Sequence, residues 1–268
     1  MQQRAEKVRK VAIAMAGVAG LVGLQQWVAA AGLPGRPVDS FLQAAGKFLT
    51  EPLVNDIYTA DPSAHVFNGK IFIYPSHDID AGVKPDDLGS HFAMRDYHVF
   101  SMDSIDGSGG KVVDHGVALD IKDVPWAGRQ MWAPDAAEKN GRYYLYFPVK
   151  DKQDAFRIGA AVGTAPQGPF KAQPEAMKGT YSIDPCVFKD TDGQYYMYFG
   201  GIWGGQLQRW ASGSYVRKDV YPSKDQPALS AKVARLGADL ISLAESPRDV
   251  VLLDEKGKPL LAGDNGRR

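Results

Sequence analysis

Short runs of aromatic and β-branched residues alternate with turn-forming residues along most of this chain. Three segments share one pattern, in which a tight-turn dipeptide is followed almost at once by an aromatic-rich run. The dipeptides are Asn68-Gly69, Asn140-Gly141 and Asp192-Gly193, and the runs are 71–74, 143–146 and 195–198. Asn-Gly and Asp-Gly tolerate the positive φ angles of a tight turn, so each segment is predicted to form a β-hairpin.

The hairpins recur at long intervals, 72 residues from Asn68 to Asn140 and 52 residues from Asn140 to Asp192. A sheet unit with such a period is typical of the blades of a β-propeller. Further strands are predicted at 97–102, 112–119 and 157–164, with a partial fourth hairpin at 250–261. The predicted fold class is therefore all-β, of the propeller type with three to four blades. A β-sandwich with three similar hairpins is the alternative.

The charges of the chain balance, with 31 Lys and Arg residues against 31 Asp and Glu residues. No basic excess marks a nucleic-acid-binding protein, so no nucleic-acid partner is predicted. Cys186 is the only cysteine, which excludes an internal disulfide and a cysteine zinc cluster. We expect Cys186 to be a small buried residue in a strand, because free cysteines are often buried.

The N-terminus carries a basic start, an apolar stretch at 11–24 and small residues at Ala29 and Ala31. This order is typical of a secretory signal peptide with cleavage after Ala31. The stretch is shorter than the roughly 20 apolar residues of a membrane-spanning helix. An uncleaved anchor and an ordinary amphipathic helix are the alternatives.

The predicted organisation is a signal peptide at 1–31, a linker at 32–54 and a partial propeller at 55–268. The mature protein is then exported to the periplasm or secreted, with no stable membrane partner once the signal is cleaved.

Two aspartates, Asp61 and Asp184, occupy the same place in their repeats, directly before a proline at the start of an innermost strand. Equivalent positions on different blades face one another across the axis of a propeller. Glycoside hydrolysis needs paired carboxyl groups, one that activates water and one that protonates the leaving oxygen. Trp132 and Trp203 lie near these motifs and could form walls for a sugar, although core packing is the alternative for each.

Three motifs in order resemble glycoside hydrolase family 43: Tyr58 to Pro62, Met131 to Asp135, and Ser182 to Pro185 with Phe199-Gly200-Gly201. The likeness is strongest to the β-xylosidase and α-L-arabinofuranosidase branch. The resemblance implies a five-bladed β-propeller that inverts the anomeric centre. It also implies that Asp61 is the general base and that Asp184 modulates the pKa of the acid. Trp132, Asp135 and Trp203 are expected to bind substrate.

The general acid of that family is a glutamate at the head of the next blade, and the resemblance implies that it falls beyond Arg268. Of the two glutamates after Asp184, Glu245 lacks the hairpin that should follow it, and Glu255 lies in a hydrophilic turn. Calcium is implied only for the full-length family fold, on the propeller axis. The five histidines show no helical i, i+4 pair, so no cofactor and no metal are predicted from this chain.

Three functions are thus considered. The first is hydrolysis of xylan- or arabinan-type oligosaccharides as a β-xylosidase or α-L-arabinofuranosidase, with an oligosaccharide as the partner. The second is a truncated, non-catalytic carbohydrate-binding propeller that lacks the general acid. The third is an exported propeller that serves as a scaffold for protein interactions, which rests on analogy of fold alone.

Overall fold

The structure is a computed structural model that describes residues 52–105 and 111–264. The described strands belong to one compact unit that begins at Leu53. The predicted signal peptide and all but the last residues of the predicted linker lie outside the described residues. Within the described part of the chain, no helix is long and apolar enough to cross a bilayer.

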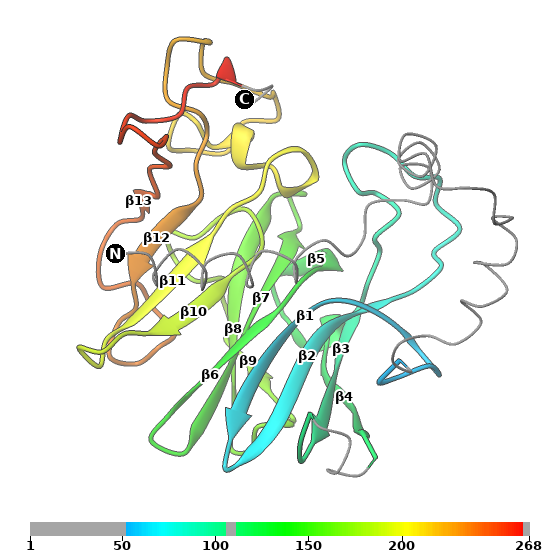
Figure 1. Ribbon diagram of the computed structural model, residues 1–268. Helices are drawn as coiled ribbons and strands as arrows, with labels where there is room; N and C mark the ends of the chain where they lie inside the picture. Colours follow the sequence, from blue (N-terminus) through cyan, green and yellow to red (C-terminus); the bar gives the residue numbers. More distant parts are fainter. Residues whose placement is uncertain (1–51, 106–110, 265–268) are drawn as a thin grey trace, which may run out of the picture. The chain divides into compact units, whose positions relative to one another are not determined.

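The described residues form three antiparallel sheets that follow one another along the chain (Figure 1). The first sheet consists of β1 (Tyr58–Phe67), β2 (Lys70–Asp78), β3 (Asp96–Met102) and β4 (Val113–Asp120). The second consists of β5 (Ala127–Met131), β6 (Asp135–Lys139), β7 (Arg142–Asp151), β8 (Phe156–Gly163) and β9 (Lys171–Ala172). The third consists of β10 (Cys186–Lys189), β11 (Tyr195–Phe199), β12 (Lys232–Arg235) and β13 (Arg248–Asp249).

Short 3₁₀ helices complete the secondary structure: η1 (Ile121–Asp123), η2 (Trp203–Gly205) and η3 (Leu207–Arg209). This architecture confirms the all-β prediction and the strands predicted between the hairpins. At 250–261 the expected hairpin is reduced to one isolated bridge between Leu253 and Pro259, closed by a turn at Asp254. A chain with three blade-like sheets in sequence order is what the period of the repeats predicts.

The tight turns form where the sequence predicts them. Asn68 and Gly69 join β1 to β2 with φ angles of 54° and 77°, and Asn140 and Gly141 join β6 to β7 with 55° and 73°. Both φ angles are positive in each pair, as a two-residue type I′ hairpin requires. The third turn is longer, and the Asp190 N–H donates to the carbonyl of Gln194 across it.

The central strand β7 is buried along both faces, because it carries an almost unbroken apolar and aromatic sequence. Two strands share one of its edges: β6 pairs with its first half and β5 with its second half. The break between them falls at 132–134, which places Trp132 at the junction. The Trp132 N–H remains attached to β7 by donating to the carbonyl of Pro148 over 3.0 Å.

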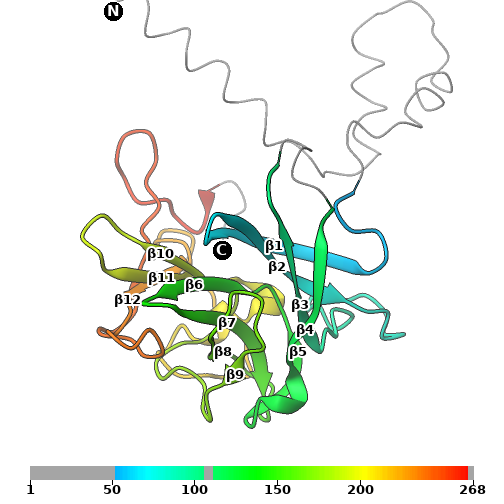
Figure 2. The same ribbon diagram turned by 90° about the horizontal axis from the view of Figure 1, so that it is seen from below.

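Two apolar layers hold the sheets together, one on each side of the second sheet. The first layer lies between the first and second sheets and includes Tyr74, Tyr97 and Phe147. The second lies between the second and third sheets and includes Tyr146, Met197 and Phe199. The inner strand β6 contacts both β1 and β10, and it lies between them in Figures 1 and 2. The leading ends of these inner strands therefore come together.

Cys186 is exposed, and the prediction that it is buried is wrong. It is the first residue of β10, and its neighbour Val187 takes the buried side of the strand. Successive strand residues alternate between faces, so the thiol projects away from the apolar layer.

Candidate active site

Asp61 lies in a bulge near the start of β1. The pairing of β1 with β2 shifts register between Ala60 and Ser63, and Asp61 has a φ of 47°. A bulge re-aims the side chain that it carries, and Pro62 supplies no N–H that the ladder would need. Asp61 is exposed as a result, and its carboxylate is open to a substrate.

Asp184 adopts the same unusual conformation at the head of the third sheet, with a φ of 57° before Pro185. The segment ahead of it is fixed by buried contacts: the Ser182 hydroxyl donates to the carbonyl of Gly205 over 2.7 Å. A Cβ on Gly201 would lie 2.8 Å from the Ile183 side chain and 3.7 Å from Asp184 Oδ2, so Gly201 packs closely beneath this turn.

The two aspartates act on each other electrostatically. Burial of its carboxyl group and the negative charge on Asp61 together raise the pKa of Asp184 to about 6, and burial has the larger effect. Asp184 is exposed when the whole residue is considered. The charged form is disfavoured because protein atoms crowd its carboxyl group. The structure thus brings together the two carboxylates that the sequence paired.

Asp135 has a different position from these two aspartates. It follows the proline of its repeat, and Ala133 occupies the place equivalent to Asp61 and Asp184. The Asp135 carboxylate is buried and accepts from the Val187 N–H over 2.6 Å, and His65 Nε2 lies 2.6 Å from its other oxygen. These contacts connect all three sheets. The sugar contact expected of Asp135 stays a prediction, and the described contacts give it a structural role.

Trp132 lies between β5 and β6, and Trp203 is the first residue of η2. The Trp132 indole donates from Nε1 to the carbonyl of Phe92 over 2.8 Å and packs against Phe156 with ring centroids 4.6 Å apart. A Cβ on Gly204 would lie 3.0 Å from the Trp132 ring, so η2 lies directly against it. Trp203 is 54% exposed and has a φ of 55°, so little packing holds its ring.

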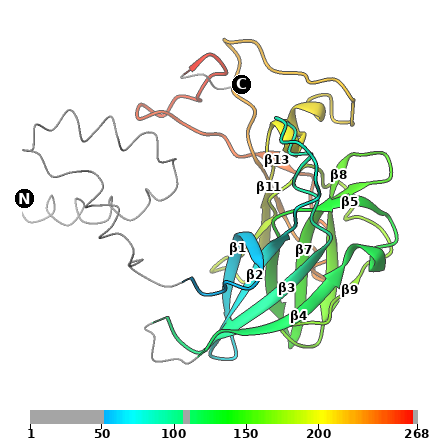
Figure 3. The same cartoon turned by 90° about the vertical axis from the view of Figure 1, so that its right-hand side faces the viewer.

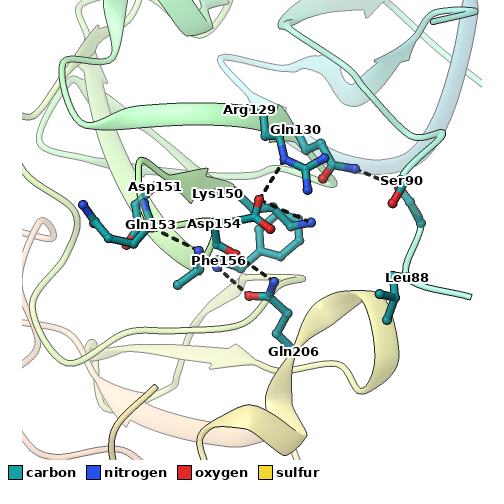
Figure 4. Close-up of polar contacts among 12 residues, drawn as sticks. Leu88, Ser90, Arg129, Gln130, Lys150, Asp151, Gln153, Asp154, Phe156 and Gln206 are labelled. Carbon is teal, nitrogen blue, oxygen red and sulfur yellow. Dashed lines mark hydrogen bonds and ion pairs between the residues drawn. The ribbon is translucent and has the colours of Figure 1, made fainter. Parts of the chain in front are cut away.

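A buried lysine lies beside the Phe156 ring, against which Trp132 packs. Lys150 is 3% exposed, and burial lowers its pKa to about 8. Its Nζ lies 5.1 Å from the centre of the Phe156 ring and 4.0 Å from Asp154 Oδ1. Figure 4 shows Lys150 and Asp154 beside this ring, with Gln206 accepting from the Phe156 N–H over 2.9 Å. The Phe156 ring therefore lies between Trp132 and the buried Lys150.

Asp78 is a site residue that the sequence analysis missed. Burial raises the pKa of Asp78, and the charge on Asp61 raises it further, while a 3.2 Å hydrogen bond from Ser76 opposes the shift. Asp78 also lines a cavity of about 300 Å³ together with the exposed ring of Phe92. It belongs to no motif, and its only sequence signal is its place at the end of the strand that follows the first hairpin.

The two late glutamates lie in other surroundings. Glu245 Oε1 accepts from the Arg235 N–H over 3.0 Å and lies 3.6 Å from Arg248 Nη1, in a network at the outer strands. Glu255 is exposed in the turn at 254–257. Among the described residues, no group of three metal-ligating side chains gathers around Asp61 and Asp184. No step is therefore assigned to calcium.

Comparison with known proteins gives the family. Residues 113–232 match the model of glycosyl hydrolases family 43. A xylosidase/arabinosidase 43A of Humicola insolens is 52% identical over 224 residues, which are 81% of this chain and 68% of the relative. A xylosidase/arabinosidase of Bacteroides ovatus is 53% identical over 216 residues, 81% of this chain and 66% of the relative.

Solved structures agree. A family 43 β-xylosidase/α-arabinofuranosidase from a compost metagenome, crystallised with xylotriose in a calcium-free form, matches with a TM-score of 0.77 and 62% identity. The match covers 81% of this chain and 66% of that one. A Xanthomonas citri enzyme complexed with xylose matches with a TM-score of 0.76 and 53% identity, over 87% of this chain and 67% of that one. The chain spans about two thirds of the length of these relatives, and it belongs to family 43 of the glycosyl hydrolases.

Proposed function

We propose that the protein hydrolyses O-glycosidic bonds in xylan- or arabinan-type oligosaccharides, as a β-xylosidase or α-L-arabinofuranosidase. The observation that carries this proposal is the pair Asp61 and Asp184, which share one backbone conformation on two sheets and interact through their charges. Relatives named as xylosidases and arabinosidases support the substrate class. The xylotriose and xylose in two structural relatives support an oligosaccharide as the partner.

In the proposed reaction Asp61 is the general base. Its exposed carboxylate accepts a proton from a water molecule as that water attacks the anomeric carbon, which inverts the configuration. A separate acid must protonate the leaving oxygen, and its own pKa has to be raised for that purpose. Neither Glu245 nor Glu255 lies in suitable surroundings, so neither receives this role.

Asp184 is proposed to modulate the pKa of that acid. A carboxylate close to a second carboxyl group disfavours ionisation of its neighbour. The raised pKa of Asp184 is consistent with a crowded group of this kind. Trp132 and Trp203 are proposed to form the walls of the sugar site, Trp132 held rigidly by its packing and Trp203 exposed above it.

Turnover of 4-nitrophenyl β-D-xylopyranoside, 4-nitrophenyl α-L-arabinofuranoside and xylobiose tests the proposal. Asp61→Asn is expected to lower kcat/KM by about 10²–10⁴-fold, the usual contribution of a general base. Asp103→Asn alters an exposed aspartate that directly follows β3 of the same sheet, so it is the matched control and is expected to retain activity. Binding of xylotriose without turnover by the unaltered protein would favour the non-catalytic carbohydrate-binding module instead.

We also propose that the protein is exported to the periplasm or secreted, on the strength of the basic and apolar N-terminal pattern. N-terminal sequencing of protein recovered outside the cytoplasm is expected to begin at Gly32. Recovery of the intact N-terminus from the cytoplasmic fraction alone would oppose export.

A further inference from the structure

The first sheet carries a cluster of metal-ligating side chains away from the paired aspartates. His77 lies near the end of β2, and Asp96 and His98 lie two residues apart at the start of β3. Residues two apart on a strand project to the same face, so Asp96 and His98 both lie beside His77. Figure 3 shows β2 and β3 as neighbours in this sheet.

The three donor atoms converge. One nitrogen from each imidazole and one oxygen of Asp96 lie within 4.8 Å of one another. His77 Nδ1 is 2.6 Å from Asp96 Oδ1, and His98 Nε2 is 4.0 Å from the same oxygen. Ligands at zinc-bond lengths in a tetrahedral site are about 3.4 Å apart. Small side-chain rotations would therefore bring all three atoms into ligand positions.

A fourth residue orients the cluster. His98 Nδ1 lies 3.0 Å from both carboxylate oxygens of Asp114, on the adjacent strand β4. Asp114 accepts the Nδ1 proton, which leaves the lone pair of Nε2 directed toward Asp96 and His77. Metal-binding histidines are held in this way by a carboxylate on the other ring nitrogen.

The surroundings suit a labile ion. The three side chains retain between 15% and 21% of their exposure, so an ion can reach them while much of the bulk water is excluded. Two imidazoles and one carboxylate favour borderline cations such as Zn²⁺ over Ca²⁺, which prefers oxygen ligands. No metal is predicted from the sequence because the histidines form no helical i, i+4 pair, whereas these ligands come from two strands.

We propose that His77, Asp96 and His98 bind one divalent zinc-class cation that cross-links β2 and β3. The ion replaces the hydrogen bond between His77 and Asp96, and water completes its coordination. Neither Asp61 nor Asp184 is among the three ligands, and no step of the proposed hydrolysis is assigned to the ion.

Calorimetric titration of the chelator-treated, tag-free protein with ZnCl₂ tests the proposal. One zinc ion is expected to bind per chain, and an excess of CaCl₂ is expected to leave the isotherm unchanged. His98→Ala is expected to abolish saturable binding. Asp114→Asn should weaken it by about 10–100-fold, because loss of an orienting carboxylate has that effect.

Two control variants separate this site from other zinc ligands. His115→Ala removes a histidine of the same sheet that lies outside the cluster, and Cys186→Ser removes the single thiol. Both are expected to bind one zinc ion with unchanged affinity. Absence of zinc binding, unchanged binding by His98→Ala, or loss of binding by Cys186→Ser would each overturn the proposal.

Imidazole ¹⁵N NMR of the unaltered protein gives a test that needs no variant to fold. Zinc is expected to shift Nδ1 of His77 and Nε2 of His98 and to leave His115 unchanged. Shifts confined to other histidines would place the ion elsewhere and contradict the assignment.

Discussion

Asp61 and Asp184 adopt left-handed backbone conformations, with φ angles of 47° and 57°, in front of prolines on two sheets separated by a third. Non-glycine residues rarely take this conformation, which is strained for a residue that carries a Cβ. The conformation recurs at two equivalent positions, and the two side chains interact electrostatically. This recurrence favours a functional role for the pair.

The raised pKa of Asp184 predicts a pH-dependent cost to stability. The folded-state pKa of about 6 exceeds the ordinary value of 3.8, so the folded chain holds this proton more tightly than the unfolded chain. The protonated Asp184 makes its full contribution to the free energy of unfolding below about pH 4, and this contribution is lost as the pH rises through 6. Asp184→Asn is therefore expected to raise the melting temperature at pH 7 but not at pH 4. An equal shift at both pH values would contradict the assignment.

The link through Asp135 predicts a large loss of stability on truncation. Asp135→Ala leaves the buried Val187 N–H without its acceptor and removes the contact to His65, so the free energy of unfolding should fall by about 1–3 kcal/mol. Asp103→Ala, which removes an exposed ion pair with Lys70, should cost no more than about 1 kcal/mol. Urea unfolding followed by circular dichroism measures both, and similar values for the two variants would refute the link.

The lowered pKa of Lys150 predicts that stability rises with pH, whereas the raised pKa of Asp184 predicts that it falls. Its folded-state pKa of about 8 lies below the ordinary 10.5, so the unfolded chain binds this proton more tightly. Stability should rise between pH 8 and pH 10.5 as the proton leaves. Lys150→Met should therefore stabilise the protein at pH 7, with the gain shrinking as the pH approaches 10. Thermal unfolding at a series of pH values measures this, and a gain that grows with pH would argue against a buried charge.

Substitution of Trp203 is expected to weaken sugar binding and to leave the free energy of unfolding nearly unchanged. Its ring is 54% exposed, so Trp203→Ala should change the free energy of unfolding by no more than about 0.5 kcal/mol. If the ring forms a wall of the sugar site, the same change should weaken xylotriose binding by about tenfold, equivalent to about 1.4 kcal/mol. Calorimetric titration with xylotriose measures the loss. Unchanged affinity would remove Trp203 from the site.

The sequence predicted those features that depend on local chemistry. Asn68-Gly69 and Asn140-Gly141 encode their turns within two residues. The runs after them encode the strands β2 and β7, of which β7 is buried on both faces. The equivalence of Asp61 and Asp184 is also predicted from the sequence, because each precedes a proline at the same place in its repeat. The roles of general base for Asp61 and of pKa modulator for Asp184 come from the resemblance to the family, because local sequence patterns do not specify them.

Other features depend on which strands become neighbours. Asp135 resembles a site residue in its motif, yet its contacts with His65 and Val187 arise only when β6 packs between β1 and β10. Asp78 and the cluster around Asp96 belong to no motif, because their partners come from adjacent strands at a register that the sequence does not state. The burial predicted for Cys186 is wrong for the same reason, since the face of the strand that a side chain occupies depends on how the strand packs.

The configuration of the xylose first released from 4-nitrophenyl β-D-xylopyranoside, whose leaving group needs little protonation, tests the central claim most directly. It is followed by ¹H NMR for the unaltered protein and for Asp61→Asn. We predict that the unaltered protein releases α-xylose from the β-linked substrate, and that Asp61→Asn loses this activity by about 10²–10⁴-fold while still binding xylotriose. Release of β-xylose, or normal turnover by Asp61→Asn, would contradict the assignment of Asp61 as the base of an inverting glycosidase.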